Sequence, residues 1–246
     1  MRPNTKFIDM MKNSRGVLPD SSTVLLMHFD GDLLDYSGRA HHATNNITFP
    51  ASITSDYKQF GYGQSLNTNL GGSSYIECDA HSDWDLGTTF TIDGWFNTNS
   101  RGTDAYRLEK NIVGTGFSGA NWQVVITSQE VAPGAGVYES KLAFWANGMQ
   151  AWCTLSSNLQ IDTWYHFAIV RTGSTSATWK FFANGTEKTK TLFSGSYAPT
   201  LTSTGANLSI GNIGSNLHAD GCKIDELRIS SNARWSADFT PQNIPY

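Results

Sequence analysis

Cysteine is scarce in this sequence and follows no known pairing pattern. The chain of 246 residues contains three cysteines, Cys78, Cys153 and Cys222, which is an odd number at long spacings. A disulfide scaffold uses an even number of cysteines, and a zinc site uses short paired motifs. We therefore interpret the three as reduced, small apolar side chains, with a disulfide or a metal role as the alternative.

Long apolar runs and dense charge are also missing. No segment approaches the ~18 consecutive apolar residues of a membrane-spanning helix, and residues 1–17 lack the apolar run of a signal peptide. Only 15% of the residues are charged, with a formal net charge of −4. Nucleic-acid binding needs clustered Lys and Arg. We expect no membrane span, no nucleic-acid partner, and a protein that folds in a reducing cytoplasm.

The sequence is rich in β-strand patterns joined by turns. Alternating or continuous apolar patterns predict strands at residues 24–29, 74–78, 90–96, 122–127, 142–146, 149–155, 164–171, 177–183, 186–192, 208–210 and 224–229. Asn147-Gly148 and Asn184-Gly185 are each flanked by such patterns and predict two-residue hairpins. Trp164–Arg171 is apolar on both faces, which predicts a central strand covered on both sides. The fold class is therefore all-β, as a closed sandwich or jelly roll.

Residues 1–20 differ from the rest and predict a separate N-terminal arm. Four apolar side chains can form one face of a short helix: Phe7, Ile8, Met10 and Met11. The segment ends at the breakers Gly16 and Pro19. Either it is a frayed tail, or it is an arm that docks on a partner through those four residues. Residues 21–246 then form one domain.

Several motifs in a fixed order resemble a known family. Residues 164–171 (WYHFAIVR), 181–185 (FFANG) and 223–230 (KIDELRIS) resemble the laminin-G-like, concanavalin A-like jelly rolls. This resemblance implies a two-sheet antiparallel jelly-roll β-sandwich over nearly the whole chain. It leaves function open, because the fold hosts lectins, glycan hydrolases, adhesion modules and viral structural proteins.

The two ends of the domain narrow the resemblance further. The start at residues 25–38 (LLMHFDGDLLDYSG) and the end at residues 224–230 (IDELRIS) and 233–241 (ARWSADFTP) are similar to domains of bacteriophage virion proteins. Such domains occur as tail-associated, head-fibre or capsid-decoration modules.

Paired carboxylates for glycan hydrolysis are hard to find. A glycosidase needs two carboxyl groups facing one sugar. Asp225 and Glu226 are neighbours on a predicted strand, so we expect them to point to opposite faces. Asp83 and Asp85 have suitable spacing but flank Trp84 in a predicted loop. We therefore expect no enzymatic activity.

Calcium is the better chemical hypothesis, because Asp30 and Asp32 lie in one turn and calcium prefers several oxygen ligands. The resemblance implies a calcium ion between the positions of Asp30 and Asp225, with Asp32 and Asp220 as weaker candidates. Strand alternation predicts Asp225 on the same face as Leu227 and Ile229. The alternative is that these carboxylates cap turns or pair with arginine.

No other cofactor is expected. His41 and His42 are adjacent, and adjacent residues rarely bind one ion together, while His166 lies mid-strand and is interpreted as a core histidine. No Cys or His pair has the spacing of a zinc site.

Aromatic residues in Gly/Ser/Asn-rich segments are candidates for stacking on sugar rings. These are Tyr57, Phe60, Tyr62, Tyr106, Phe117, Tyr138 and Tyr197. Loops present the binding residues of a sandwich, although such aromatics also pack over sheet edges or fill protein interfaces.

We thus predict a non-enzymatic structural or interaction protein of a phage virion, a capsid-decoration or tail-associated module made in the host cytoplasm. Its N-terminal arm would dock on other virion proteins, a homotrimer is compatible with it, and weak binding to host-surface glycan would add to its role. The alternative is a stand-alone carbohydrate-binding lectin module, and a glycoside hydrolase is the weaker third candidate.

Overall fold

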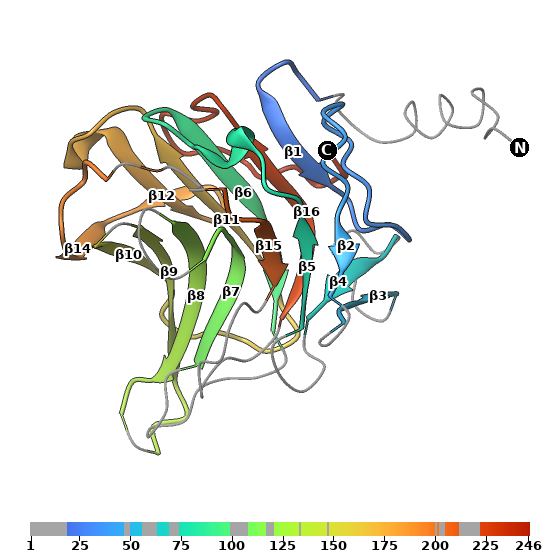
Figure 1. The fold of residues 1–246 in the computed structure, drawn as a ribbon. Coiled ribbons are helices and arrows are strands. Elements are labelled where there is room, and N and C mark those ends of the chain that lie inside the picture. Colours follow the sequence, from blue (N-terminus) through green and yellow to red (C-terminus); the bar gives the residue numbers. More distant parts are fainter. Residues whose placement is uncertain are drawn as a thin grey trace, which may run out of the picture.

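The protein is a two-layer β-sandwich in a computed structural model (Figure 1). The residues described are 19–46, 50–55, 63–68, 74–98, 108–116, 121–132, 134–146, 148–199, 201, 205–211 and 222–246. The four apolar residues of the predicted arm, Phe7, Ile8, Met10 and Met11, lie outside them. In the described part of the chain, no helix is long and apolar enough to cross a membrane.

The first sheet, sheet A, has eight strands. In order they are β13 (Thr186–Lys188), β12 (Trp179–Ala183), β11 (Trp164–Arg171), β6 (Phe90–Asn97), β16 (Lys223–Ser230), β4 (Ser65–Asn67) and β3 (Ser52–Thr54), with β1 (Thr23–Met27) also paired to β16. All of these pairings are antiparallel.

The second sheet, sheet B, also has eight strands. In order they are β14 (Lys190–Ser194), β10 (Met149–Ser156), β9 (Tyr138–Ala146), β8 (Trp122–Glu130), β7 (Leu108–Gly114), β15 (Leu208–Gly211), β5 (Tyr75–Cys78) and β2 (Thr44–Asn45). Their pairings are antiparallel as well. Two short 3-10 helices, η1 (Ser82–Trp84) and η2 (Ser176–Thr178), lie in connections. The predicted all-β jelly-roll sandwich is confirmed.

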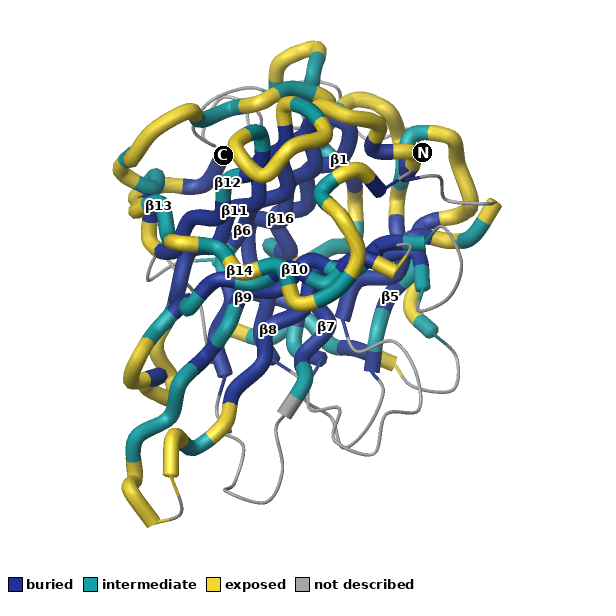
Figure 2. The backbone as a smooth tube through the Cα atoms, turned by 90° about the vertical axis from the view of Figure 1, so that its left-hand side faces the viewer, coloured by how far each residue is buried: buried dark blue, intermediate teal, exposed yellow. Residues whose placement is uncertain are grey.

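The core lies between the two sheets and follows the alternation of each strand (Figure 2). In β6, Phe90, Ile92 and Phe96 face the core as predicted, while Asp93 lies across from Arg228 on the outer face. The cysteines are buried in the same core and unpaired. Burial raises the pKa of the Cys78 thiol to about 12, which keeps it protonated and unreactive.

The central strand β11 is buried on both faces, as predicted. One side joins the main core, and the other forms a small cluster of Ala168, Val170 and Phe182. Trp235 and Phe239 from the C-terminal segment, residues 231–246, pack on this cluster. The outer face of sheet A is therefore covered by the end of the chain.

Both predicted hairpins form. Asn184 and Gly185 have φ of 48° and 78° between β12 and β13, as this turn type requires. Gly148 has φ of 79° between β9 and β10. The strand predicted at residues 186–192 is wrong, because the chain changes sheets after Lys188 and splits into β13 and β14. The change lets Leu192 pack against the core while β14 pairs with β10.

Candidate functional site

The predicted calcium ligands lie around the point where β16 changes partners. β16 pairs with β4 at Ile224 and with β1 at Leu227. Asp30 follows β1, and its Oδ1 accepts a hydrogen bond from the backbone N–H of Gln64, beside β4 (2.9 Å). Asp225 lies on β16 itself. The fold thus brings the segments of Asp30 and Asp225 to one region, and calcium binding there stays a prediction.

The other two candidate ligands add little. Asp32 is held in its own turn, where Oδ1 accepts the N–H of Leu34 (3.2 Å) and Oδ2 accepts the hydroxyl of Tyr36 (2.8 Å). Asp220 lies outside the described residues.

A β-bulge in β16 overturns the predicted facing of its acidic residues. Glu226 has φ of 50°, and the pairing with β6 shifts between Asp225 and Arg228. A bulge adds one residue and reverses the alternation beyond it. Leu227 and Ile229 therefore face the core, whereas Asp225 lies across from Trp95 on the outer face. Asp225 is not on the face of Leu227 and Ile229, contrary to the prediction.

The same bulge puts Glu226 on the outer face of sheet A, beside Asp225 rather than opposite to it. Both Glu226 carboxylate oxygens lie close to Nδ1 of His28, at 2.9 and 2.8 Å. The backbone N–H of Tyr246 donates to Glu226 Oε2 (2.9 Å). The expectation that Asp225 and Glu226 point to opposite faces is thus also wrong.

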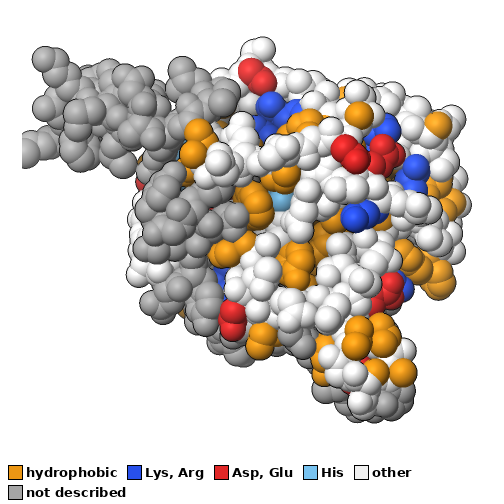
Figure 3. Space-filling model, turned by 180° about the vertical axis from the view of Figure 1, so that it is seen from behind, with side chains coloured by type: hydrophobic (Ala, Val, Ile, Leu, Met, Phe, Trp, Pro, Cys, Tyr) orange, Lys and Arg blue, Asp and Glu red, His pale blue; other side chains and the backbone are white. Residues whose placement is uncertain are grey.

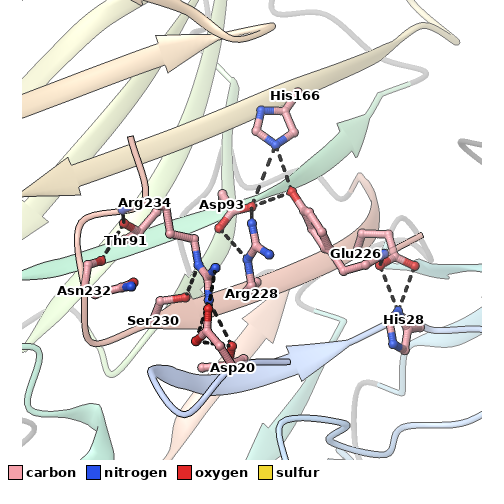
Figure 4. Close-up of polar contacts among 12 residues, drawn as sticks. Asp20, His28, Thr91, Asp93, His166, Glu226, Arg228, Ser230, Asn232 and Arg234 are labelled. Atoms are coloured by element: carbon pink, nitrogen blue, oxygen red, sulfur yellow. Dashed lines mark hydrogen bonds and ion pairs between the residues drawn. The ribbon is translucent and has the colours of Figure 1, made fainter. Parts of the chain in front are cut away.

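Asp93 lies at the centre of this outer face and is fully buried (Figure 4). The guanidinium of Arg228 donates to both carboxylate oxygens of Asp93, at 3.1 and 2.9 Å, and the hydroxyl of Tyr246 donates to Oδ2 (2.5 Å). Burial alone would raise the pKa of Asp93, but the charge of Arg228 and the hydrogen bonds of His166 and Arg228 outweigh it and lower that pKa to about 2. The Arg228 guanidinium also lies 3.7 Å from the centre of the Tyr246 ring.

These contacts hold Tyr246 in place rather than forming an open binding site. Asp93 and Glu226 both bind Tyr246 of the C-terminal segment, at opposite ends of that residue. Both carboxylates are buried and hydrogen-bonded on sheet A. Their geometry secures the C-terminal segment against the sheet.

The outer face of sheet B carries partly exposed aromatic side chains. Trp145 on β9 and Trp152 on β10 are partly exposed, and their sequence neighbours on both sides face the core. The register pairs Trp145 with Gln150 and Trp152 with Ala143. The two tryptophans are therefore diagonal neighbours on one face, a separation of about 7–8 Å between Cα atoms.

Polar and aromatic groups extend this surface. The Phe193 ring stacks on Trp152 at 5.1 Å and is itself 67% exposed. The Lys141 ammonium lies 5.2 Å from the Trp152 ring centre. We call Trp145, Trp152, Phe193 and Lys141 the sheet B platform.

Two buried polar atoms under the platform have no hydrogen-bond partner. They are Oε1 of Gln123 and Nε1 of Trp145, whose residues face each other across β8 and β9. Unpaired buried polar groups are uncommon in folded proteins.

Most of the aromatic residues predicted to bind glycan lie outside the described part of the chain. Tyr57, Phe60, Tyr62, Tyr106 and Phe117 lie outside the described residues. Tyr138 starts β9 rather than lying in a loop, and like Tyr197 it packs against the core. The sequence prediction did not include the platform, because it considered aromatic residues in loops and these lie on strands. The signal was present, since a two-residue turn at Asn147-Gly148 fixes the register that puts Trp145 and Trp152 on one face.

On the face in Figure 3, the described basic side chains are scattered among acidic and uncharged ones. The expectation of no nucleic-acid partner stays a prediction.

Comparisons with solved structures give the fold. The binding domain of Paraclostridial Mosquitocidal Protein 1 superposes with a TM-score of 0.58 at 12% identity, over 86% of this chain and 49% of that one. The botulinum neurotoxin serotype D binding domain gives 0.56 at 14% identity, over 86% and 49%. This chain thus spans about half the length of these toxin domains.

Domain 4 of AbnA, a GH43 extracellular arabinanase from Geobacillus stearothermophilus, was solved in complex with arabinotriose. It gives a TM-score of 0.55 at 20% identity, over 86% of this chain and 93% of that one. Identities this low show a shared fold alone.

Sequence comparison gives the family. No curated protein matches the chain. A laminin-G family profile, described as the concanavalin A-like lectin/glucanases superfamily, matches residues 70–238, well over half of the chain. Together with the two antiparallel sheets, this match shows that the chain belongs to the concanavalin A-like lectin/glucanases superfamily.

Proposed function

We propose that the protein is a non-catalytic binding module that recognises glycan through the sheet B platform. The observation that carries the proposal is the pair Trp145 and Trp152, partly exposed on one face of two hydrogen-bonded strands. Aromatic rings offer flat apolar surfaces to the C–H faces of sugars, and neighbouring polar groups fix their hydroxyls. Gln150 and Lys141 on the same strands can supply such hydrogen bonds.

The outer face of sheet A supports the non-catalytic part of the proposal. Asp93 and Glu226 are both buried and hydrogen-bonded beneath the C-terminal segment. A glycosidase pair must reach the scissile bond from two sides, and these two carboxylates are engaged in holding Tyr246. The arabinotriose complex of the structurally similar AbnA domain supports a sugar ligand by analogy only.

The test is glycan binding by the untagged full chain, with an array to find a ligand and calorimetry to measure affinity. We expect Trp145→Ala and Trp152→Ala each to weaken binding by more than about tenfold, as truncation of an aromatic anchor does. Trp164→Ala is the matched control, because Trp164 is also a partly exposed strand tryptophan but lies on sheet A. Equal loss in all three variants, or none in the two platform variants, contradicts the proposal.

We further propose that the module works in a phage virion, as a decoration or tail-associated protein. The similarity of residues 25–38 and 224–241 to phage virion domains supports this setting, and many copies on one particle would turn weak glycan contacts into firm attachment. Deleting residues 1–20 tests the docking arm. Loss of assembly with sugar binding intact supports it, and unchanged assembly rules it out.

A further inference from the structure

Two histidines and one aspartate meet at the surface beside η1, far from the sheet B platform in sequence. Among the described residues, His41, His81 and Asp83 are the one group of three whose ligand atoms all lie within 4.8 Å of one another. His41 Nε2 is 2.7 Å from Asp83 Oδ2, and His81 Nδ1 is 3.5 Å from the same oxygen. These are three side chains of the types that bind transition metals.

The local structure holds the three groups in place. η1 begins at the cap residue His81, whose Nδ1 accepts the backbone N–H of Asp83 (3.1 Å). The next residue, Trp84, is fully buried and anchors the turn. His41 lies against Trp84, with ring centres 4.7 Å apart, and its backbone N–H donates to Asp35 (3.0 Å). The three side chains are therefore held close together, and metal binding at His81 Nδ1 would replace the hydrogen bond that it accepts from Asp83.

We propose that His41, His81 and Asp83 bind one divalent transition-metal ion, of which zinc is the best fit. Two imidazole nitrogens and one carboxylate oxygen suit zinc, which takes three protein ligands and a water at open sites. With metal–ligand bonds of about 2.1 Å, tetrahedral ligands lie about 3.4 Å apart. The 3.5 Å between His81 Nδ1 and Asp83 Oδ2 matches that value. His41 Nε2, hydrogen-bonded to the same oxygen at 2.7 Å, would move slightly away from it to admit the ion. His81 is 49% exposed, which leaves an approach from solvent.

Arg39 is the competitor for this site. Its Nη1 lies 3.2 Å from Asp83 Oδ2, and its side chain is 39% exposed, with Nε donating to the carbonyl oxygen of Thr23 (3.3 Å). Without metal, Arg39 and the two histidines lie against the Asp83 carboxylate, and a metal ion would replace Arg39.

The sequence did not predict zinc, because neither His41-His42 nor any other His or Cys pair has ligand spacing. The fold brings together histidines that are far apart in the sequence. It brings the loop after β1 against η1, so that residues 41 and 81 become neighbours, with ring centres 4.6 Å apart.

The test is zinc titration by calorimetry on the untagged full chain, with metal content measured after dialysis. We expect one zinc per chain, and more than about tenfold weaker binding in His41→Ala, His81→Ala and Asp83→Asn. Arg39→Ala should bind zinc more tightly, because the competing charge is gone. Asp79→Asn is the control: it removes an exposed carboxylate near the same turn and should bind zinc like the original chain.

Thermal unfolding without zinc shows whether each variant folds. If Asp83→Asn fails to fold, the half-exposed His81 and the exposed Arg39 still decide the question, since neither is part of the core. No zinc binding by the original chain overturns the proposal. So does zinc binding that survives unchanged in His41→Ala and His81→Ala.

Discussion

Asp93 and Arg228 form the buried ion pair on which the outer face of sheet A depends. Asp93 is fully buried and accepts two hydrogen bonds from the Arg228 guanidinium, from Nε and Nη2. Removing one partner leaves an uncompensated buried charge, so Arg228→Ala should lower the free energy of unfolding by about 3–5 kcal/mol. Lys180→Ala breaks a partly exposed pair with Glu187 on the same sheet and should cost about 0–1 kcal/mol. Denaturant unfolding measures both, and equal effects would contradict this account.

The pKa of Asp93 predicts acid sensitivity. In the folded protein this pKa is about 2, against an ordinary 3.8. A depressed folded pKa stabilises the protein above the ordinary value, and the stabilisation is lost as pH falls from about 4 toward about 2. Asp93→Asn lacks this titration, so its stability should fall less steeply over that range. Denaturant midpoints measured across these pH values for both proteins make the test. If stability falls equally steeply with pH in the two proteins, Asp93 is not the source of the acid sensitivity.

The C-terminal segment approaches the β12–β13 hairpin closely at Gly185, whose carbonyl oxygen accepts the N–H of Phe239 (2.9 Å). Gly185 has φ of 78°, and a Cβ there would lie 1.9 Å from the carbonyl oxygen of Phe239. Gly148 occupies the same turn position with φ of 79° and has nothing within 4 Å of its Cβ position. Both alanine variants bear the backbone strain, of about 1 kcal/mol or more. Only Gly185→Ala also displaces the segment.

Gly185→Ala should therefore destabilise the protein more than Gly148→Ala, and limited proteolysis should cut its C-terminal segment faster. Comparable unfolding free energies and cleavage rates in the two variants would show that the contact with Phe239 contributes little.

Elements with regular alternation were predictable from the sequence, and irregular ones were not. The predicted strand at residues 164–171 matches β11 residue for residue. β7 was not predicted, because its pairing with β8 shifts between Asn111 and Val113 and this irregularity breaks the alternation. β2, β3 and β4 are two or three residues long, too short to carry a pattern.

The candidate sites also differ in whether the sequence could predict them. The Trp145–Trp152 pair follows from a two-residue hairpin and simple alternation, so the sequence contained it. The face of the sheet on which Asp225 lies depends on a positive φ at Glu226. No local sequence pattern predicts that φ. The contact of His41 with His81 comes from long-range packing, which spacing along the chain cannot reveal.

At the scale of the whole molecule, β16 joins distant parts of the chain. It pairs with β6 on one side and with β1 and β4 on the other. β1 is the first described strand and β16 the last, so their pairing closes sheet A across most of the sequence. Contacts at this junction therefore affect the stability of the entire fold.

Calcium at the Asp30–Asp225 junction would strengthen this closure. Asp30 already links the end of β1 to the start of β4 through Gln64, and an ion shared with Asp225 would tie both to β16. At a calcium concentration about 100-fold above Kd, binding adds about 2.7 kcal/mol. For a chain of this size that raises Tm by about 5–10 °C.

We expect Asp30→Asn to abolish this rise in Tm, and Asp79→Asn, which changes an exposed carboxylate away from the junction, to keep it. Differential scanning calorimetry with calcium and with a chelator makes the measurement. Because the junction closes sheet A, the shift should move a single cooperative transition rather than split it. If neither calcium nor chelator moves Tm, the ion is not bound there, and the three segments are held by β-pairing and the Asp30–Gln64 hydrogen bond without it.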